Sequence, residues 1–256
     1  MGLGGLAASR ADALSALSWL VEAGVDTLVG DAPYPWLAAP APPVIDAPAE
    51  KRAERPASRT ERPAPPSADS AEVERRVLAA DSLDALKQAA ATLRAKPIFA
   101  DGDPASGVMI IGQDAAPDDD RTGRPFSGPS GALLDRMLAA IGRDRSSVYL
   151  TNLYLWRSVG GSLSPEETRL CTLILRRHIE MARPRALLLM GEKPTKALVE
   201  TDVAITKLRG TWTDLTIAGK ALPTLITVNP AYLLRQPAAK ALAWADLRAF
   251  KSRIDA

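Results

Sequence analysis

The stretch from Gly112 to Gly128 reads GQDAAPDDDRTGRPFSG and joins a predicted strand to a predicted helix. The strand, VMIIG at residues 108–112, is a short apolar run, and the helix, GALLDRMLAAIG at residues 131–142, ends at a glycine. Four aspartates, two arginines and one phenylalanine lie between them. Because α/β proteins bind ligands beyond the carboxyl ends of their strands, this polar stretch is a candidate site.

Strands and helices alternate in the same way towards the C-terminus. Further apolar strands are predicted at 148–152 (VYLTN), 186–191 (ALLLMG) and 223–229 (PTLITVN). Amphipathic helices are predicted at 164–181, where Ser164 is the N-cap, at 194–200 and at 238–254. Continuous apolar strands between helices are typical of parallel sheets covered on both faces. We therefore predict an α/β fold of three layers, with a four-stranded parallel sheet between helices.

Polar residues follow each of the predicted strands. The strand ends carry Gly112-Gln113-Asp114, Thr151-Asn152, Gly191-Glu192 and Asn229-Pro230. Because the carboxyl ends of parallel strands lie at the same edge of a sheet, we expect these groups to converge on one site.

The N-terminal part of the chain has a different character. Residues 1–31 contain a predicted amphipathic helix from Asp12 to Gly24, and residues 32–69 form a Pro/Ala-rich linker with ten prolines before residue 67. The α/β domain is placed at 70–256, with its core beginning at about residue 97. Its first part, up to Leu93, has a helical pattern in which Ser82 is a candidate cap.

Composition narrows the class of protein. A net charge of +2 over 256 residues does not by itself indicate a nucleic-acid-binding protein. The single cysteine, Cys171, excludes an internal disulfide, a cysteine-ligated zinc site and a cluster held by four thiolates. We find neither a signal peptide nor an apolar run long enough to cross a bilayer, so we expect a cytoplasmic monomer with no membrane contact.

The order of these segments resembles the uracil-DNA glycosylase superfamily, and most closely its bacterial family 4. The resemblance runs from Val108 to the C-terminus and rests on the acidic loop, GRPFSG, the helix GALLDRML, the strand ending in Thr-Asn and the Asn-Pro motif. It implies a DNA repair enzyme that hydrolyses the N-glycosidic bond of uracil, or of another deaminated base, flipped out of DNA.

The resemblance also implies roles for individual residues. Phe126 corresponds to the platform on which the flipped base stacks, and Asn152 to the amide that reads the base. Gly112 is a further candidate substrate-binding residue. Asp114 is the candidate catalytic carboxylate, because GQD resembles the water-activating loop of family 1, whereas family 4 has glutamate at Gln113. Gln113 and Asn229 are the other candidate catalytic residues. Asp118, Asp119 and Asp120 are expected to form a solvated loop.

The resemblance further implies contacts with DNA around the site. Leu233 and Leu234 resemble the wedge that fills the space left by the flipped base. The candidate phosphate contacts are Arg121, Arg124, Arg235 and Lys240.

The sequence departs from family 4 at two places. The cluster cysteines are missing apart from Cys171, so we expect no 4Fe–4S cluster and no other metal, with Trp156 and Phe99 filling the space. Asn229 stands where the last motif usually has histidine, which donates to the developing uracil anion. Because asparagine is a neutral donor of different reach, we expect slower or altered chemistry.

Structural roles compete with these functional ones. Asp114, Asn152 and Asn229 also suit turns, and Phe126, Leu233 and Leu234 also suit a core. Cys171, Trp212 and Trp244 are expected in the core, and His178 at the surface or a helix end. The alternative function is a weakened or inactive glycosylase-fold protein that binds DNA or a repair partner. A protein partner of the N-terminal helix is compatible with either function.

Overall fold

The structure, a computed structural model, describes residues 68–157 and 163–255. The predicted N-terminal helix from Asp12 to Gly24 and the Pro-rich linker up to residue 67 lie outside the described residues. The α/β unit is therefore described by itself.

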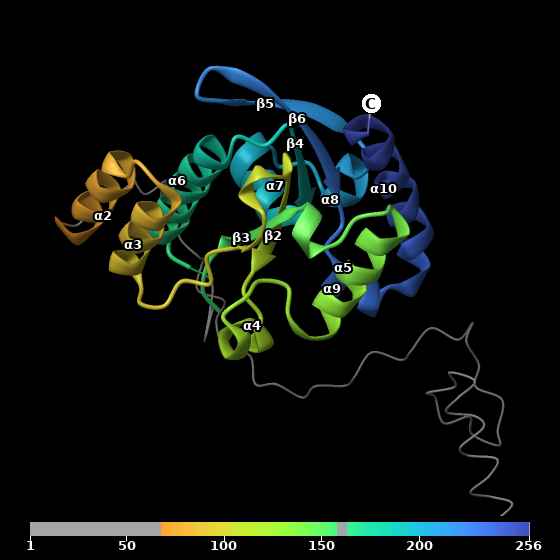
Figure 1. Cartoon of the computed structure of the whole chain (residues 1–256), viewed down its shortest axis with the longest axis horizontal. Helices are drawn as coiled ribbons and strands as arrows, with labels where there is room; N and C mark the ends of the chain where they lie inside the picture. The colour runs from red at the N-terminus through yellow and green to blue at the C-terminus, as the bar shows by residue number, and fades with distance from the viewer. Residues whose placement is uncertain (1–67, 158–162, 256) are drawn as a thin grey trace, which may run out of the picture. The chain divides into compact units, whose positions relative to one another are not determined.

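A six-stranded sheet forms the middle of this unit (Figure 1). The strands are β1 (Asp101–Gly102), β2 (Val108–Asp114), β3 (Tyr149–Tyr154), β4 (Ala186–Met190), β5 (Trp212–Ile217) and β6 (Lys220–Thr227). Their order in the sheet is β1-β3-β2-β4-β6-β5. The four predicted strands are confirmed as β2, β3, β4 and β6, and all three pairings among them are parallel.

The predicted number of strands was too low, because both edge strands are antiparallel and were not predicted. The β5 segment WTDLTI alternates in burial towards its end and has no continuous apolar run. It pairs with β6 through a two-residue turn, Ala218-Gly219, in which both φ angles are positive (46° and 76°). Such turns match the twist of a hairpin. The sheet is therefore mixed, with a parallel centre.

Helices cover both faces of the sheet, as predicted (Figure 1). The α-helices are α2 (Ala68–Ala79), α3 (Leu83–Leu93), α4 (Pro117–Thr122), α5 (Gly128–Ala140), α6 (Pro165–Ala182), α7 (Glu192–Val199), α8 (Ile205–Leu208), α9 (Pro230–Arg235) and α10 (Lys240–Ile254). Short 3-10 turns are η1 (Pro104–Ser106), η2 (Arg145–Ser147) and η3 (Pro237–Ala239). The predicted caps are confirmed, since Ser82 accepts a hydrogen bond from Ala85 N–H and Ser164 accepts one from Glu167 N–H.

The alternation of side chains along the strands separates two hydrophobic cores. Met109 and Ile111 of β2 lie in a core with residues of α2, α3 and α6, whereas Val108 and Ile110 lie in a core with residues of α5, α9 and α10. No helix in the described residues is long and apolar enough to cross a membrane.

The exposure of three side chains can be compared with what the sequence predicted for them. His178 was expected at the surface or at a helix end; it lies in the C-terminal part of α6 and is buried. Its ring stacks on Phe99 at 4.2 Å, and its Nε2 lies 2.8 Å from the Tyr149 hydroxyl. Trp244 was expected in the core but is 41% exposed, and it lines an open groove between α5 and α10. Cys171 is buried, as predicted.

Candidate functional site

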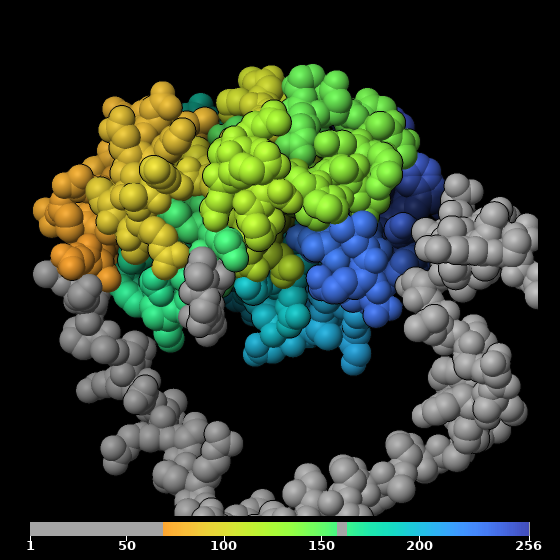
Figure 2. Space-filling model, turned by 90° about the horizontal axis from the view of Figure 1, so that it is seen from below, coloured from red at the N-terminus to blue at the C-terminus, as the bar shows by residue number. Residues whose placement is uncertain are grey.

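The candidate site lies at the carboxyl ends of the parallel strands, where β2 and β3 run side by side. Gly112 pairs with Asn152 and Asp114 pairs with Tyr154 across these two strands. Figure 2 views the molecule from the end at which α4 lies, in yellow-green, near the blue residues around α9. The predicted convergence of strand ends on one edge is therefore present.

Gly112, Phe126 and Asn152 come into direct contact. A Cβ atom added to Gly112 would collide with Oδ1 of Asn152 and with the ring of Phe126. The glycine therefore allows an aromatic ring from the loop to lie against the end of β2, beside the amide from β3.

The side-chain amide of Asn152 has no hydrogen-bond partner among the described residues, although the residue is only 2% exposed. Its oxygen and nitrogen are not among the enclosed side-chain atoms that lack a partner, so the small exposed part of the residue includes its amide. An accessible amide with no partner in the protein can offer a ligand both a donor and an acceptor. The arrangement fits recognition of a small planar ligand better than a purely structural role.

Asp114 ends β2, and its carboxylate is paired with Lys193 of α7. Lys193 Nζ lies 2.8 Å and 2.7 Å from the two carboxylate oxygens, and it also lies 5.1 Å from the centre of the Tyr154 ring. About a third of the Asp114 side chain is exposed. The carboxylate is therefore accessible at the rim of the site but already has a cationic partner.

Gln113 points towards the neighbouring strand end. Its Oε1 accepts a hydrogen bond of 3.2 Å from the backbone N–H of Lys193, and its side chain fills the space that a Cβ on Gly191 would need. Gln113 thereby links β2 to the β4–α7 turn that carries Lys193.

Asn229 is the N-cap of α9, which is the structural alternative raised by the sequence. Its Oδ1 accepts a hydrogen bond of 2.9 Å from Ala231 N–H, and its Nδ2 donates one of 3.4 Å to the Met190 carbonyl. One amide hydrogen of Asn229 is left for another acceptor.

The three aspartates expected in a solvated loop lie in the short helix α4, and Asp119 is buried, which corrects both parts of the prediction for this residue. This residue is 1% exposed, and its carboxylate accepts hydrogen bonds from the backbone N–H groups of Ala116 and Ser127 at 2.9 Å and 2.7 Å. Burial raises the pKa of Asp119, while these backbone hydrogen bonds oppose that rise. Asp119 is therefore a structural support of the loop.

The candidate DNA-contacting residues differ in how exposed they are to solvent. Leu233 is buried in the core beside α5, so its prediction as a wedge is corrected, whereas Leu234 is 42% exposed. The cations Arg121, Arg124, Arg235 and Lys240 are exposed. Arg121 pairs with Asp118 at 3.3 Å.

The residues present do not fit a cluster held by cysteines. Cys171 is the only cysteine of the chain, and burial raises the pKa of its thiol to about 12, so it is not a thiolate. Trp156 and Phe99 are buried in the same core as Cys171, and the Trp156 indole N–H donates to the Ala95 carbonyl at 3.1 Å. The described residues contain no group of acidic, histidine or cysteine side chains suited to a metal ion.

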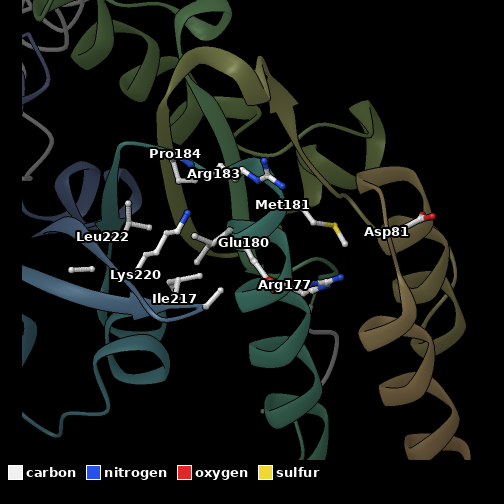
Figure 3. A pocket seen from close by; sticks show the side chains of 12 residues that line it. Asp81, Arg177, Glu180, Met181, Arg183, Pro184, Ile217, Lys220 and Leu222 are labelled. Atoms are coloured by element: carbon white, nitrogen blue, oxygen red, sulfur yellow. Dashed lines mark hydrogen bonds and ion pairs between the residues drawn. The ribbon is translucent and has the colours of Figure 1, made fainter.

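A pocket of about 580 Å³ lies at the opposite end of the sheet (Figure 3). Arg183 and Pro184, which precede β4, and Lys220, which begins β6, line this pocket. None of the candidate site residues contributes to its lining. This volume therefore does not mark the predicted site.

Sequence reasoning missed two residues that shape the site. Lys193 was missed although Gly191-Glu192 was recognised as a strand end, and the lysine follows one position later. Arg145 was missed because nothing in its own segment indicates that it reaches the carbonyl groups of Pro125 and Phe126, at 3.2 Å and 2.5 Å.

Comparison with known proteins adds independent findings. A sequence model of the Uracil DNA glycosylase superfamily matches residues 99–248. The chain is similar to the type-4 uracil-DNA glycosylase of Pyrobaculum aerophilum, with 31% identity over 162 residues that cover 61% of this chain and 83% of the relative. The type-4 uracil-DNA glycosylase of Thermotoga maritima is 31% identical over 144 residues, 56% of this chain and 73% of the relative. That of Archaeoglobus fulgidus is 28% identical over 141 residues, 53% and 71% of the two chains.

Proposed function

The chain belongs to the uracil DNA glycosylase superfamily, and on that premise we propose that it is a DNA glycosylase that releases uracil, or another deaminated base, from DNA. The base is flipped out of the helix, and its N-glycosidic bond is hydrolysed. The names of its relatives, type-4 uracil-DNA glycosylases, support this substrate class.

The observation that carries the proposal is the accessible amide of Asn152, which has no hydrogen-bond partner among the described residues and lies beside the Phe126 ring. The imide edge of uracil offers an acceptor and a donor in positions that one carboxamide can match. Cytosine has an exocyclic amine where uracil has an oxygen, so the same amide disfavours it. Phe126 supplies the stacking surface, as aromatic side chains do for flipped bases.

Asp114 is the proposed catalytic carboxylate. When the bond between C1′ and the base breaks, its electron pair leaves with the base, and the sugar becomes an oxocarbenium-like cation. A carboxylate at the rim of the site stabilises this cation and orients the water that adds to C1′. Lys193 holds that carboxylate in the described state through both oxygens.

Asn229 is proposed to stabilise the departing anion. Its Nδ2 makes a single 3.4 Å hydrogen bond to the Met190 carbonyl, so the second amide hydrogen remains for a base oxygen. Because this donor is neutral, we expect a slower reaction than a histidine would support. Loss of one such donor typically costs about 10²–10³ in rate.

The deciding experiment uses oligonucleotides with a single defined lesion. The full-length protein is incubated with uracil opposite guanine, uracil opposite adenine and single-stranded uracil, and abasic sites are cleaved with alkali. The same assay covers hypoxanthine and xanthine. Strand cleavage at the lesion is the expected result, and the absence of cleavage with every lesion would exclude the proposed activity.

A second candidate function is DNA binding without cleavage. It is favoured by the state of two site residues, since both oxygens of Asp114 are paired with Lys193 and Asn229 caps α9. This function predicts DNA affinity that falls steeply with salt, without release of any base. Measurements of binding by fluorescence anisotropy at several salt concentrations, beside the cleavage assay, separate the two candidates.

A further inference from the structure

The peptide group that joins Phe126 to Ser127 is held at both ends by charged side chains. The Ser127 N–H donates to Oδ1 of Asp119 at 2.7 Å, and the Phe126 carbonyl oxygen accepts from Nη2 of Arg145 at 2.5 Å. A carboxylate on the N–H and a guanidinium on the C=O both fit the dipole of the same peptide group. Hydrogen bonds to charged partners are stronger than those between neutral groups.

Phe126 needs such support because its backbone is in the left-handed region, with a φ of 55°. For a residue other than glycine this conformation costs about 1–2 kcal/mol, since Cβ approaches the following carbonyl. Residues keep such conformations only where their surroundings enforce them. The direction of the Phe126 ring depends on this backbone conformation.

Arg145 is itself fixed by groups from two other elements. Its Nε donates to Asp135 of α5 at 2.8 Å, and its Nη1 donates to Asp101 of β1 at 2.7 Å and to the Pro125 carbonyl at 3.2 Å. Its planar fork thereby joins an edge strand, a helix and the loop. On the far side, Asp119 also accepts from Ala116 N–H, so it spans the loop from one end to the other.

The backbone of helix α5 also packs against this peptide group. A Cβ on Gly131 would collide with the Phe126 carbonyl group, so the helix backbone lies directly against the peptide that Arg145 binds. Displacement of this peptide is therefore restricted from three sides, by α5, Arg145 and Asp119.

We propose that Arg145 and Asp119 are positioning residues that orient Phe126 for base stacking by clamping the Phe126–Ser127 peptide group. This inference rests on the proposed function, because it assigns a task to Phe126. It also gives a purpose to the two-residue strand β1, which places Asp101 beside Arg145.

The activity test is a double-mutant cycle between Arg145→Lys and Phe126→Ala, with release of uracil from an oligonucleotide as the readout. Lysine keeps the positive charge but has a single ammonium group, so it cannot donate to all the acceptors that the guanidinium of Arg145 binds. We expect Arg145→Lys to lower kcat/KM by roughly 10- to 100-fold, through kcat more than KM, because misplacement within a site is costly. In the Phe126→Ala background the same change should cost less than about twofold, since the group it positions is gone. Equal losses in both backgrounds would overturn the proposal.

Arg143→Lys is the matched control. The side chains of Arg143 and Arg145 are both 23% exposed and both pair with an aspartate, but Arg143 pairs with Asp255 and has no contact with Phe126 among the described residues. Its replacement should leave kcat/KM unchanged. A loss in this control equal to that of Arg145→Lys would show a general stability effect and would count against the clamp.

Exchange of the Ser127 amide hydrogen, followed by NMR, tests the clamp without reference to activity. We expect faster exchange in Arg145→Lys and in Asp119→Asn, and unchanged exchange in Arg143→Lys. If the wild-type protein releases no base, the proposed function fails, whereas faster exchange in the two variants still supports the clamp. Unchanged exchange in both variants overturns it.

Discussion

Asp114 carries the proposed chemistry, and its neutral amide analogue is the direct test at the scale of a single residue. Asp114→Asn keeps the shape of the side chain but removes the charge that stabilises the sugar cation. We expect the rate of uracil release to fall by about 10²–10⁴-fold, as for other groups of this kind. Single-turnover kinetics with a uracil-containing oligonucleotide measures this change directly.

Asp120→Asn is the control for Asp114→Asn, because Asp120 is an exposed aspartate of the nearby helix α4. It loses the same charge at a short distance in sequence and should keep the wild-type rate. An unchanged rate in Asp114→Asn would show that another group provides the carboxylate.

Gly112 tests the contact between the platform and the reading amide. Alanine at this position would place Cβ against Asn152 Oδ1 and the Phe126 ring. We expect Gly112→Ala to lower the free energy of unfolding by about 1–3 kcal/mol, as overpacking does, and to abolish base release. Urea unfolding and the oligonucleotide assay give the two values.

Gly123→Ala separates backbone strain from this lack of space. Gly123 has a φ of 70°, and nothing lies within 4 Å of an added Cβ, so only the strain of about 1–2 kcal/mol is expected, with base release retained. Wild-type stability and activity in Gly112→Ala would contradict the described contact.

At this scale, the sequence alone identified site residues that lie opposite each other on adjacent parallel strands. Gly112 and Asn152 were identified from their places at strand ends, and their pairing follows from strand register. Lys193 was not found, because it lies 79 positions from Asp114 and a lysine at the start of a helix is unremarkable by itself. The φ of Phe126 was equally out of reach, since it is enforced by Asp119 and Arg145 from elsewhere in the fold.

At the scale of elements, α9 offers a matched pair of adjacent leucines. Leu233 is 1% exposed and Leu234 is 42% exposed. Leu233→Ala should lower the free energy of unfolding by about 2–5 kcal/mol, because it leaves a cavity, whereas Leu234→Ala should change it by less than about 0.5 kcal/mol.

Base release should depend on Leu234, the residue that matters less for stability. A wedge is needed only where a base pair is opened, so Leu234→Ala should slow base release from duplex DNA more than from single strands. Parallel assays on both substrates measure this ratio. An equal effect on both substrates would remove Leu234 from the wedge role.

The elements themselves were predictable where one face or both faces are apolar. Strands β2, β3, β4 and β6 are buried along much of their length and gave clear apolar runs. The edge strands did not, because β1 has only two residues and β5 is largely accessible. An edge strand is defined by its pairing partner, which a local pattern does not contain.

At the scale of the whole molecule, buried His178 makes stability depend on pH. Burial lowers the pKa of His178 from its usual 6.5 to about 3, and burial also raises the pKa of its neighbour Tyr149, which therefore keeps its proton. Below pH 6.5 the unfolded chain binds a proton that the folded protein excludes. The contribution is thus complete above pH 6.5 and is lost as the pH falls towards 3, by up to about 1.4 kcal/mol per pH unit.

His178→Phe removes this titration while retaining an aromatic ring against Phe99. Denaturant unfolding of both proteins at several values between pH 6.5 and pH 4 should give a steeper loss of stability for the wild type than for the variant. Identical slopes would show that His178 does not contribute.

The buried Cys171 has a practical consequence for labelling chemistry. It is the only cysteine in the chain, and its thiol is enclosed and protonated, so a maleimide dye should leave the native protein unmodified. A cysteine introduced at an exposed position such as Asp120 would then be the sole attachment point for a fluorophore. One such dye, near the loop that carries Phe126, would report the arrival of DNA one molecule at a time.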